Sequence, residues 1–379
     1  MSRVLILTAG YGEGHNSAAR ALQAAFAEQP GIEPELIDLF ALKAPRLNDL
    51  TRRLYLGMIN RAPWIWRRTY AWLDRSPRAG LLFSSLPGHA RLLAHLVAEK
   101  RPIAVVSAYP VYAWLFRQLD QRRVRPCPQF TVVTDAITIN SLWYRAPADG
   151  WFVTDRDSAG ILTRAGVAAA RVHVSGFPVA AAFADRPAGL VPPDPAQSAE
   201  RRVLYMINSG RARALETAQV LLRDRRWTLT ITAGRDDVLR VQLERMAAAA
   251  GAKATILGWT TRIPELLMTS HVVISKAGGA TTQESINALC PMLVNQIVPG
   301  QEEGNAELLR RHGAGELALD PAAIAASLDR AFAGDAAVWR GWRTALRRLA
   351  RPSAARDIAQ AVLEHVARTP AEGRAVAAR

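Results

Sequence analysis

The chain has almost no cysteine and no long apolar run. Its 379 residues include only Cys127 and Cys290, which lie in different halves and have no partner at a metal-ligand spacing. This argues against a disulfide framework and against a zinc site. No apolar run approaches the ~20 residues of a membrane-spanning helix. The apolar start, residues 1–10, is too short for a signal peptide and favours a first strand, so we expect a cytoplasmic protein.

Acidic residues are scarce relative to basic ones. The chain has 33 Asp and Glu against 48 Lys and Arg, a net charge of +15. This excess predicts attraction to a polyanion, and nucleic acid, an anionic membrane and a phosphorylated substrate all fit. An Ala/Arg-rich chain encoded by a GC-rich genome would have the same charge. Composition alone therefore does not identify the partner.

Length and hydrophobic patterning predict two α/β domains. Half of the residues are hydrophobic, and a chain of this length is long for one core. Short β-rich apolar runs alternate with helical stretches, which predicts doubly wound sheets. The expected strands are residues 4–7, 103–107, 129–135, 150–154, 203–207, 229–232, 254–257, 272–274 and 292–294.

The alternation is interrupted once, by a segment rich in Pro, Gly, Ser and charge. We interpret residues 185–202 as an interdomain linker. The expected domains are then 1–184 and 203–350, each Rossmann-like. Residues 351–379 are expected to form a C-terminal helix with a frayed tail.

A glycine-rich turn follows the first expected strand. Gly10, Gly12 and Gly14 stand where the backbone must pass close to a ligand and where a helix N-terminus offers free N–H donors. The spacing is not the dinucleotide fingerprint. His15, at the helix start, is placed for proton transfer. The alternative is a histidine satisfied by local hydrogen bonds.

A second glycine turn is more specific. Residues 275–284 follow the strand 272–274 and lead into a helix. Gly278 and Gly279 allow the backbone to approach a diphosphate, which the helix N-terminus favours. Glu284, one turn into the helix, can accept hydrogen bonds from two ribose hydroxyls. Otherwise it would be a solvated helix acid.

Residues 298–306, after the next strand, are polar and turn-rich. Gln301, Glu302 and Asn305 offer donors and acceptors that suit sugar hydroxyls. A plain surface turn would have the same composition.

The segment 52–78 interleaves arginines with Trp, Tyr and aliphatic residues. Trp64, Trp66, Arg67 and Arg68 are its centre. This mixture suits a lipid headgroup interface, where aromatic rings lie at the boundary and Arg meets phosphate. Single-stranded nucleic acid could be bound by the same side chains. The third interpretation is a core helix with a solvated basic face.

Four segments in order, residues 10–18, 134–135, 276–284 and 299–305, resemble the monogalactosyldiacylglycerol synthase and diacylglycerol glucosyltransferase family. These enzymes are relatives of MurG, which acts on lipid-linked peptidoglycan precursors. The resemblance spans most of the chain, and its specific part is 276–284 followed by 299–305.

The resemblance implies an inverting glycosyltransferase of the GT-B fold, with two Rossmann-like domains facing a central cleft. The first domain would take a lipid acceptor such as diacylglycerol, and the second a UDP-sugar that supplies a hexose. His15 matches the catalytic histidine, Glu284 the ribose-binding acid, and Gln301 with Glu302 the pair that holds the sugar. Thr260 matches the loop that meets the uracil. No metal or other cofactor is implied, because helix dipoles and hydroxyls offset the diphosphate charge.

The remaining expected site residues fall into two groups. Donor contacts are expected at Gly14, Asn208, Gly210, Lys276, Gly278, Gly279, Thr281 and Asn305. Acceptor and membrane contacts are expected at Trp64, Trp66, Arg67, Arg68, Asp135, Asn140 and Trp143. Two positions depart from the family pattern: Asn140 stands where a His three residues before a Trp is usual, and Asn208-Ser209-Gly210 replaces a more glycine-rich turn.

Two other functions remain open. A UDP-sugar epimerase could use the same architecture, but it needs no membrane, and the segment 52–78 argues against it. A non-catalytic membrane-binding protein has little reason to keep His15, Glu284 and Gln301 together. We therefore expect an enzyme peripherally bound to the inner face of the cell membrane, and no nucleic-acid partner.

Overall fold

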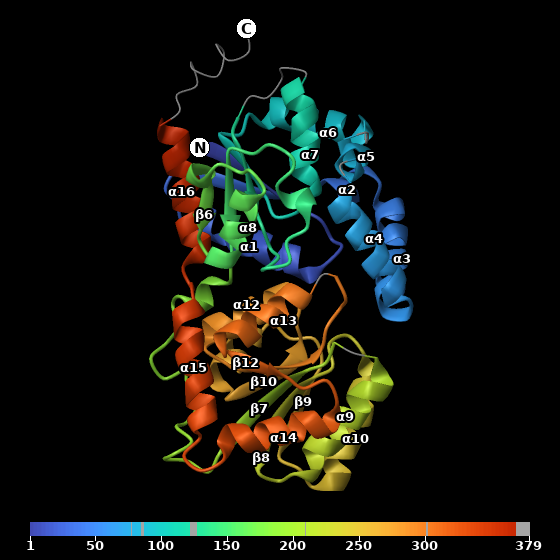
Figure 1. Ribbon diagram of the computed structural model, residues 1–379, viewed down its shortest axis with the longest axis vertical. Helices are drawn as coiled ribbons and strands as arrows, with labels where there is room; N and C mark the ends of the chain where they lie inside the picture. Colours follow the sequence, from blue (N-terminus) through green and yellow to red (C-terminus); the bar gives the residue numbers. More distant parts are fainter. Residues whose placement is uncertain (77, 85–86, 122–126, 209, 301, 369–379) are drawn as a thin grey trace. The chain divides into compact units, whose positions relative to one another are not determined.

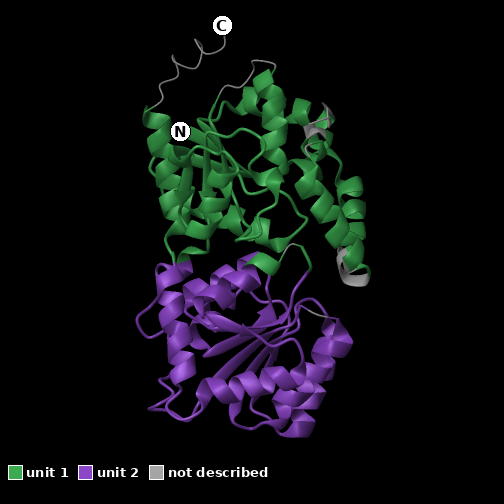
Figure 2. Ribbon diagram, viewed as in Figure 1, with its two compact units in different colours: residues 1–181, 299–304, 351–379 green, residues 182–298, 305–350 purple. Residues whose placement is uncertain are grey.

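The computed structural model describes residues 1–76, 78–84, 87–121, 127–208, 210–300 and 302–368 (Figure 1). By its contacts the chain divides into two compact units (Figure 2). The first unit comprises Met1–Ala181, Pro299–Gly304 and Arg351–Arg379, and the second comprises Ala182–Val298 and Asn305–Ala350.

The first unit is built on a six-stranded sheet in the order β2-β1-β3-β4-β5-β6, and every neighbouring pair is parallel. Its strands are β1 (Ser2–Thr8), β2 (Ile32–Asp38), β3 (Ala104–Ser107), β4 (Gln129–Val132), β5 (Gly150–Val153) and β6 (Val172–Val174). Every residue of β3 and β4 is buried, as central parallel strands covered on both faces require. The carboxyl ends of all six strands lie at one edge, where α/β folds bind ligands.

Helices cover this sheet (Figure 1). They are α1 (Glu13–Ala27), α2 (Leu39–Lys43), α3 (Pro45–Arg61), α4 (Pro63–Arg75), α5 (Ala79–Ser84), α6 (Pro87–Lys100), α7 (Val111–Gln121), α8 (Arg156–Arg164) and α16 (Ala354–Arg368), with the 3-10 turns η1 (Ser141–Trp143), η2 (Ala169–Arg171) and η3 (Ala181–Phe183). Helices α6 and α7 pack against Leu5, Leu7 and Val105 of the sheet, and α1 packs along α16.

Helices α3 and α4 form a pair joined by a single residue, Ala62. Pro45 and Pro63 each occupy the first turn, where the missing N–H is not needed and the fixed φ suits a helix. The pair contacts α2, α5 and η1, so it covers one side of the strand ends.

The second unit has a six-stranded parallel sheet in the order β12-β11-β10-β7-β8-β9. Its strands are β7 (Arg201–Met206), β8 (Trp227–Thr232), β9 (Ala254–Leu257), β10 (Val272–Lys276), β11 (Met292–Gln296) and β12 (Gly315–Leu317). Its helices are α9 (Arg211–Arg223), α10 (Asp237–Ala250), α11 (Ile263–Thr269), α12 (Gly279–Ala288), α14 (Pro321–Phe332) and α15 (Ala337–Leu349), and α13 (Glu303–His312) continues into it.

Two parallel α/β sheets are present, as the sequence predicts, and each of the expected strands coincides with an observed one. Three edge or near-edge strands were not predicted, namely β2, β6 and β12. Both cysteines are buried free thiols. In the described part of the chain, no helix combines the length and the apolar character that crossing a membrane requires.

The segment expected as a linker, 185–202, belongs to the second unit. Its Arg186 guanidinium donates to the backbone oxygens of Leu190, Met268 and Ala288, which ties the segment to that unit. Beyond residue 350 the chain returns to the first unit as α16, which has an ion pair of 2.7 Å between Arg356 and Glu28. The expected tail from residue 369 lies outside the described residues.

Candidate functional site

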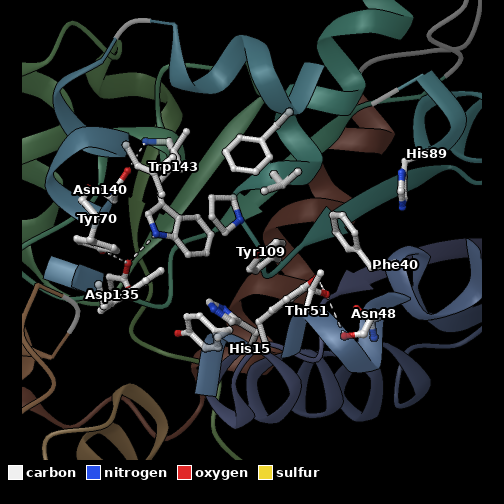
Figure 3. A pocket seen from close by; sticks show the side chains of 18 of the residues that line it. His15, Phe40, Asn48, Thr51, Tyr70, His89, Tyr109, Asp135, Asn140 and Trp143 are labelled. Carbon is white, nitrogen blue, oxygen red and sulfur yellow. Dashed lines mark hydrogen bonds between the residues drawn. The ribbon is translucent and has the colours of Figure 1, made fainter. Parts of the chain in front are cut away.

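The first unit contains a cavity of about 420 Å³ whose lining includes residues that follow β1, β3 and β4 (Figure 3). Most of its side chains are aromatic or aliphatic. They are Tyr11, His15, Phe40, Ala44, Leu47, Asn48, Thr51, Tyr55, Trp66, Tyr70, Leu73, Phe83, His89, Tyr109, Pro110, Val111, Asp135, Asn140, Leu142 and Trp143. An apolar cavity with a few convergent polar groups is typical of a small-molecule site.

The glycine turn between β1 and α1 is held by a hydrogen bond from its backbone to a side chain. The Gly10 N–H donates to Asp38 Oδ2 at 2.9 Å, which fastens the turn to the end of β2. Gly12 is the extended N-cap residue of α1, and no side chain caps this helix. Gly14 lies in the first turn, so the uncapped N–H groups predicted from the sequence are present here.

His15 lies in the first turn of α1 and lines the cavity. Its Nδ1 is 3.0 Å from Thr134 Oγ1, and its ring meets that of Tyr109 edge-on at a centroid distance of 5.1 Å. Burial lowers the pKa of His15 to about 4, although a hydrogen bond to the Ala108 backbone acts in the opposite direction. The imidazole is therefore neutral at pH 7.

Asp135, three residues past the end of β4, lies at the same end of the cavity as His15 (Figure 3). Its Oδ2 accepts hydrogen bonds from Trp143 Nε1 at 2.8 Å and from the Tyr70 hydroxyl at 3.4 Å. Burial raises the pKa of Asp135 to about 6, although these two donors lower it. The Trp143 ring is 6.0 Å from that of His15, centroid to centroid. Two titratable groups of opposite type thus flank one indole.

Asn140 caps the turn η1 rather than pointing freely into the cavity. Its Oδ1 accepts from the Leu142 N–H at 3.1 Å, and its Nδ2 donates to the Tyr70 carbonyl at 3.2 Å. The Ser141 N–H and hydroxyl donate to Asp74 Oδ1 and to the Asp74 carbonyl at 2.7 and 2.6 Å. Together these bonds join η1 to α4.

The two tryptophans predicted together on α4 have different surroundings. Trp64 is exposed, and the Arg68 guanidinium lies 5.8 Å from its ring centroid. Trp66 lines the cavity and packs between Tyr55 and Tyr70. Helix α4 therefore presents one face to the cavity and another to solvent.

In the second unit, the turn between β10 and α12 has the geometry expected of a phosphate site. Lys276 ends β10, and Gly278 is the N-cap residue of α12, which begins at Gly279. The N-cap Gly278 has no side chain to cap α12, so within the described part of the chain its first N–H groups lack the usual capping bond and suit an anionic ligand. Thr281 lies in the first turn, and Glu284 follows in the helix, partly buried.

Two amides lie beside this turn. Asn208, after β7, donates through Nδ2 to Ser275 Oγ at 2.9 Å. Asn305 donates through Nδ2 to the Ala277 carbonyl at 3.0 Å. Gly210 is the N-cap residue of α9, which starts beside Asn208. The structure thus brings Asn208 and Asn305 to the β10–α12 turn.

Thr260 lies in the loop between β9 and α11, where its Oγ1 accepts from the Arg262 N–H at 3.1 Å. Its strand β9 is separated from β10 by β7 and β8, at the same edge of the sheet. The neighbouring Trp259 is exposed, and the Arg235 guanidinium lies 5.7 Å from its ring.

The segment expected to hold the sugar is divided between the two units. Glu302 is buried and counts with the first unit, and Asn305 counts with the second. Gly300 has a φ of +86°, which glycine adopts without strain. Gln301 lies outside the described residues.

Sequence reasoning did not assign a site role to Tyr109, Asp74 or Thr134, and Thr134 appeared only in the expected strand 129–135 and in the 134–135 segment of the resemblance. Tyr109 and Thr134 each follow an observed strand by two residues, at β3 and β4, so the rule that ligands bind at carboxyl ends applies to both. Asp74 had no local signal, since its role depends on η1, 67 residues away. Among the described residues, no group of three His, Cys, Asp or Glu side chains could hold a metal ion.

The chain is similar in sequence to known glycolipid-synthesising proteins. Residues 15–179 match the family model described as monogalactosyldiacylglycerol (MGDG) synthase. A processive diacylglycerol beta-glucosyltransferase of Bacillus thuringiensis (strain Al Hakam) is 25% identical over 369 residues, 96% of this chain and 93% of that relative.

Two solved structures share the fold along nearly the whole chain. The crystal structure of Acinetobacter baumannii MurG has a TM-score of 0.63 at 14% identity, over 96% of this chain and all of that one. UDP-GlcNAc 2-epimerase from Neisseria meningitidis, bound to UDP-GlcNAc, has a TM-score of 0.60 at 11% identity, over 96% and 100%.

The fold is therefore that of the GT-B glycosyltransferases, which the UDP-GlcNAc 2-epimerases share. The matched range begins at His15, directly after the glycine turn, and ends after β6, so it includes Asp135 and η1. The resemblance to the monogalactosyldiacylglycerol synthase and diacylglycerol glucosyltransferase family is confirmed.

Proposed function

We propose that this protein is an inverting glycosyltransferase that moves a hexose from a UDP-sugar to the hydroxyl of a lipid such as diacylglycerol. The observation that carries the proposal is the cavity of the first unit, which is lined mostly by apolar side chains and has His15 and Asp135 on either side of Trp143. The family whose model matches this unit is named for a diacylglycerol glycolipid.

The cavity suits an acceptor with an apolar tail and a polar head. Phe40, Leu47 and Phe83 are among its apolar lining residues, and Phe40 lies apart from Asp135 and Trp143 (Figure 3). Apolar walls favour the tail because its burial releases water. A few convergent polar groups fix the orientation of a ligand, and we infer that the acceptor hydroxyl faces His15 and Asp135.

The second unit would hold the donor. A diphosphate would accept hydrogen bonds from the first N–H groups of α12, with Lys276 adding positive charge. Glu284 would accept from the ribose hydroxyls, and Thr260 belongs to the loop assigned to the uracil. Gln301 and Glu302 are assigned to the sugar. Further donor contacts are assigned to Gly14, Asn208, Gly210, Gly278, Gly279, Thr281 and Asn305.

The reaction would be a single displacement. The acceptor oxygen attacks the anomeric carbon as the bond to the diphosphate breaks, and UDP leaves with the electron pair. Attack opposite the leaving group inverts the configuration. His15 would remove or orient the acceptor proton, and the N-terminus of α12 would stabilise the leaving charge.

A membrane surface is the natural source of such an acceptor. Eight exposed large apolar side chains lie between residues 42 and 82, on and beside α3 and α4. They are Leu42, Leu47, Leu50, Leu54, Trp64, Ile65, Trp72 and Leu82. Between Lys43 and Arg78 the sequence has nine Lys and Arg against two Asp, a net of +7. We propose that this docking surface binds an anionic bilayer.

The alternative is a UDP-sugar epimerase, because epimerases share the fold. An epimerase acts on the sugar of its own nucleotide and has no use for an apolar cavity beside a proton-transfer group. The matching relatives described as transferases favour the same conclusion.

The test is direct. Purified protein is incubated with UDP-glucose, UDP-galactose or UDP-GlcNAc and vesicles that contain diacylglycerol, and the lipid product is identified by mass. We expect one hexose added to the lipid and free UDP released, with the β-anomer by NMR. Isomerisation of the UDP-sugar without lipid would favour the epimerase and contradict the proposal.

A further inference from the structure

The side chains of Asp135 and His15 differ in their hydrogen-bond partners. Oδ2 of Asp135 accepts from Trp143 Nε1 and from the Tyr70 hydroxyl, and both donors also line the cavity. Among the described residues, Oδ1 of Asp135 has no hydrogen-bond partner. One oxygen of this carboxylate is therefore fixed by two donors, and the other can accept from a molecule in the cavity.

His15 is engaged with the protein itself. Its Nδ1 is within hydrogen-bond distance of Thr134 Oγ1, and the ring also forms a hydrogen bond with the Ala108 backbone. Thr134 directly precedes Asp135, so the contact of His15 with the Thr134 hydroxyl restrains the segment that presents the carboxylate. Its contacts suit a residue that positions others better than one that receives a proton.

We propose that Asp135 accepts the proton of the acceptor hydroxyl, and that His15 is a positioning residue acting through Thr134. This inference rests on the proposed function. As the acceptor oxygen forms its bond to the anomeric carbon, the O–H bond breaks and its proton goes to Oδ1 of Asp135. The bond between the anomeric carbon and the diphosphate oxygen breaks, and its electron pair leaves on UDP.

The surroundings of Asp135 suit this role. Its titratable neighbour on α4 is Tyr70, which in turn interacts electrostatically with Asp74 on α4 and Tyr55 on α3. His15 lies on the other side of the Trp143 ring. Beyond Tyr70, a second cavity is lined by Arg67, Arg75 and Glu303 among others. Burial raises the pKa of Asp135 to about 6, so at pH 7 the group is ionised and still basic enough to take a proton.

The pH dependence of kcat/KM for the acceptor separates the two candidate bases. If Asp135 is the base, activity falls on the acid side with an apparent pKa near 6, where that carboxylate is protonated. If His15 is the base, the fall comes near 4. Tyr70→Phe and Trp143→Phe each remove a donor that lowers the pKa of Asp135, so we expect each to move the acid limb to higher pH.

Replacements at the two residues complete the test. Asp135→Asn should lower kcat by roughly 10²- to 10⁴-fold with UDP affinity and thermal unfolding unchanged. His15→Gln keeps a hydrogen-bonding group toward Thr134, so it should retain more activity than His15→Ala and keep the acid limb near 6.

Three results would overturn the inference: wild-type kcat in Asp135→Asn, an acid limb near 4 that His15→Gln removes, or no shift in either donor variant. Failure of the proposed function is distinguishable, because wild-type protein would then form no glycolipid with any of the three UDP-sugars. In that case the inference fails with it.

Discussion

At the scale of single residues, burial decides which ionised forms occur. His15 and Asp135 lie at the same end of one cavity, and loss of water shifts their pKa values in opposite directions, toward about 4 and about 6. Both shifts favour the neutral form, as desolvation always does. The hydrogen-bond partners of the two groups differ. Asp135 accepts from the Trp143 indole, whereas His15 forms hydrogen bonds with Thr134 and the Ala108 backbone.

Glu284 provides a residue-scale test of the donor site. We expect Glu284→Ala to weaken UDP binding by about 1 to 3 kcal/mol, because two ribose hydroxyls lose their acceptor. Glu284→Gln should lose less. Glu244→Ala, which removes an exposed acid of α10 in the same unit, is the matched control and should leave the affinity unchanged. Calorimetry showing equal UDP affinity in all variants would place the nucleotide elsewhere.

His271 makes stability depend on pH. This buried side chain donates from Nε2 to the Pro193 carbonyl and accepts from the Arg202 N–H at Nδ1. The bond at Nδ1 requires the neutral ring, because protonation would remove that acceptor. Burial lowers the pKa of His271 to about 4, below the unfolded value of 6.5. Its contribution is therefore complete above pH 6.5 and is lost as pH falls toward 4.

From pH 7 to 4.5, we expect His271 to remove about 2 kcal/mol from the free energy of unfolding. His15 acts in the same direction and Asp135 in the opposite one. The informative measurement is therefore the difference between wild type and His271→Gln in denaturant titrations at several pH values. The variant should be less stable at pH 7 and have a shallower dependence. Parallel curves would mean that His271 does not titrate in this range.

At the scale of elements, helix α4 has one face toward the cavity and another toward solvent. Trp66 and Tyr70 line the cavity, whereas Trp64 and Trp72 are exposed. Asp74, near its end, accepts both hydrogen bonds from Ser141 and so holds η1, which carries Trp143. One face of α4 thus lines the cavity and the other is exposed to solvent, and contact of the exposed face with a membrane stays a prediction.

The packing of α5 on α7 provides an element-scale prediction. A Cβ atom on Gly80 would lie 2.1 Å from the Trp114 ring, which is buried and fixed by a hydrogen bond from Nε1 to the Leu142 carbonyl. We expect Gly80→Ala to destabilise the protein by about 1 to 3 kcal/mol, because the ring or α5 must shift.

Gly341→Ala is its matched control. A Cβ atom on this helical glycine of α15 would meet no atom within 4 Å, so alanine should be neutral or stabilising by up to about 1 kcal/mol. Chemical denaturation of both variants measures the difference. Equal stabilities would show that α5 adapts freely around Trp114.

At the scale of the whole molecule, the net charge is unevenly distributed along the chain. Nearly half of the +15 comes from residues 43–78, which also contain most of the exposed large apolar side chains of the first unit. Each cation near an anionic leaflet contributes about 1 kcal/mol. The positive charge is thus concentrated in residues 43–78, whereas a bias of genomic composition alone would spread it along the chain.

Binding of the protein to anionic vesicles should therefore depend on salt concentration and on which arginines are replaced. We expect binding to anionic vesicles to rise with the anionic lipid fraction and to fall with salt, because the Debye length shrinks from ~10 Å at 0.1 M to ~3 Å at 1 M. Arg53→Glu with Arg68→Glu should reduce binding, and Trp64→Ala with Trp72→Ala should reduce its salt-resistant part.

Arg223→Glu with Arg245→Glu changes the charge by the same amount on exposed positions of α9 and α10 and is the control. Cosedimentation measures all three pairs, and UDP affinity should not change in any of them. If the control pair loses as much binding as the α3–α4 pair, only net charge matters and the docking surface is wrong.

The sequence by itself determined the two parallel sheets, because short apolar runs such as 272–274 that alternate with helical stretches are typical of strands buried on both faces. It missed β2, β6 and β12, since short or half-exposed edge strands such as Val172–Val174 have a weak pattern. It also located the turns at His15 and at Gly278, because glycine between a strand and a helix is a local signal.

Only the tertiary structure decided what surrounds those residues. It turned Trp66 inward and Trp64 outward, although they are two positions apart on one helix. It also placed Asp135 between Tyr70 and Trp143, which are 65 and 8 residues distant. Burial and hydrogen bonding depend on contacts between remote segments, so the state of Asp135 and the face that meets solvent follow from packing, which no local pattern contains.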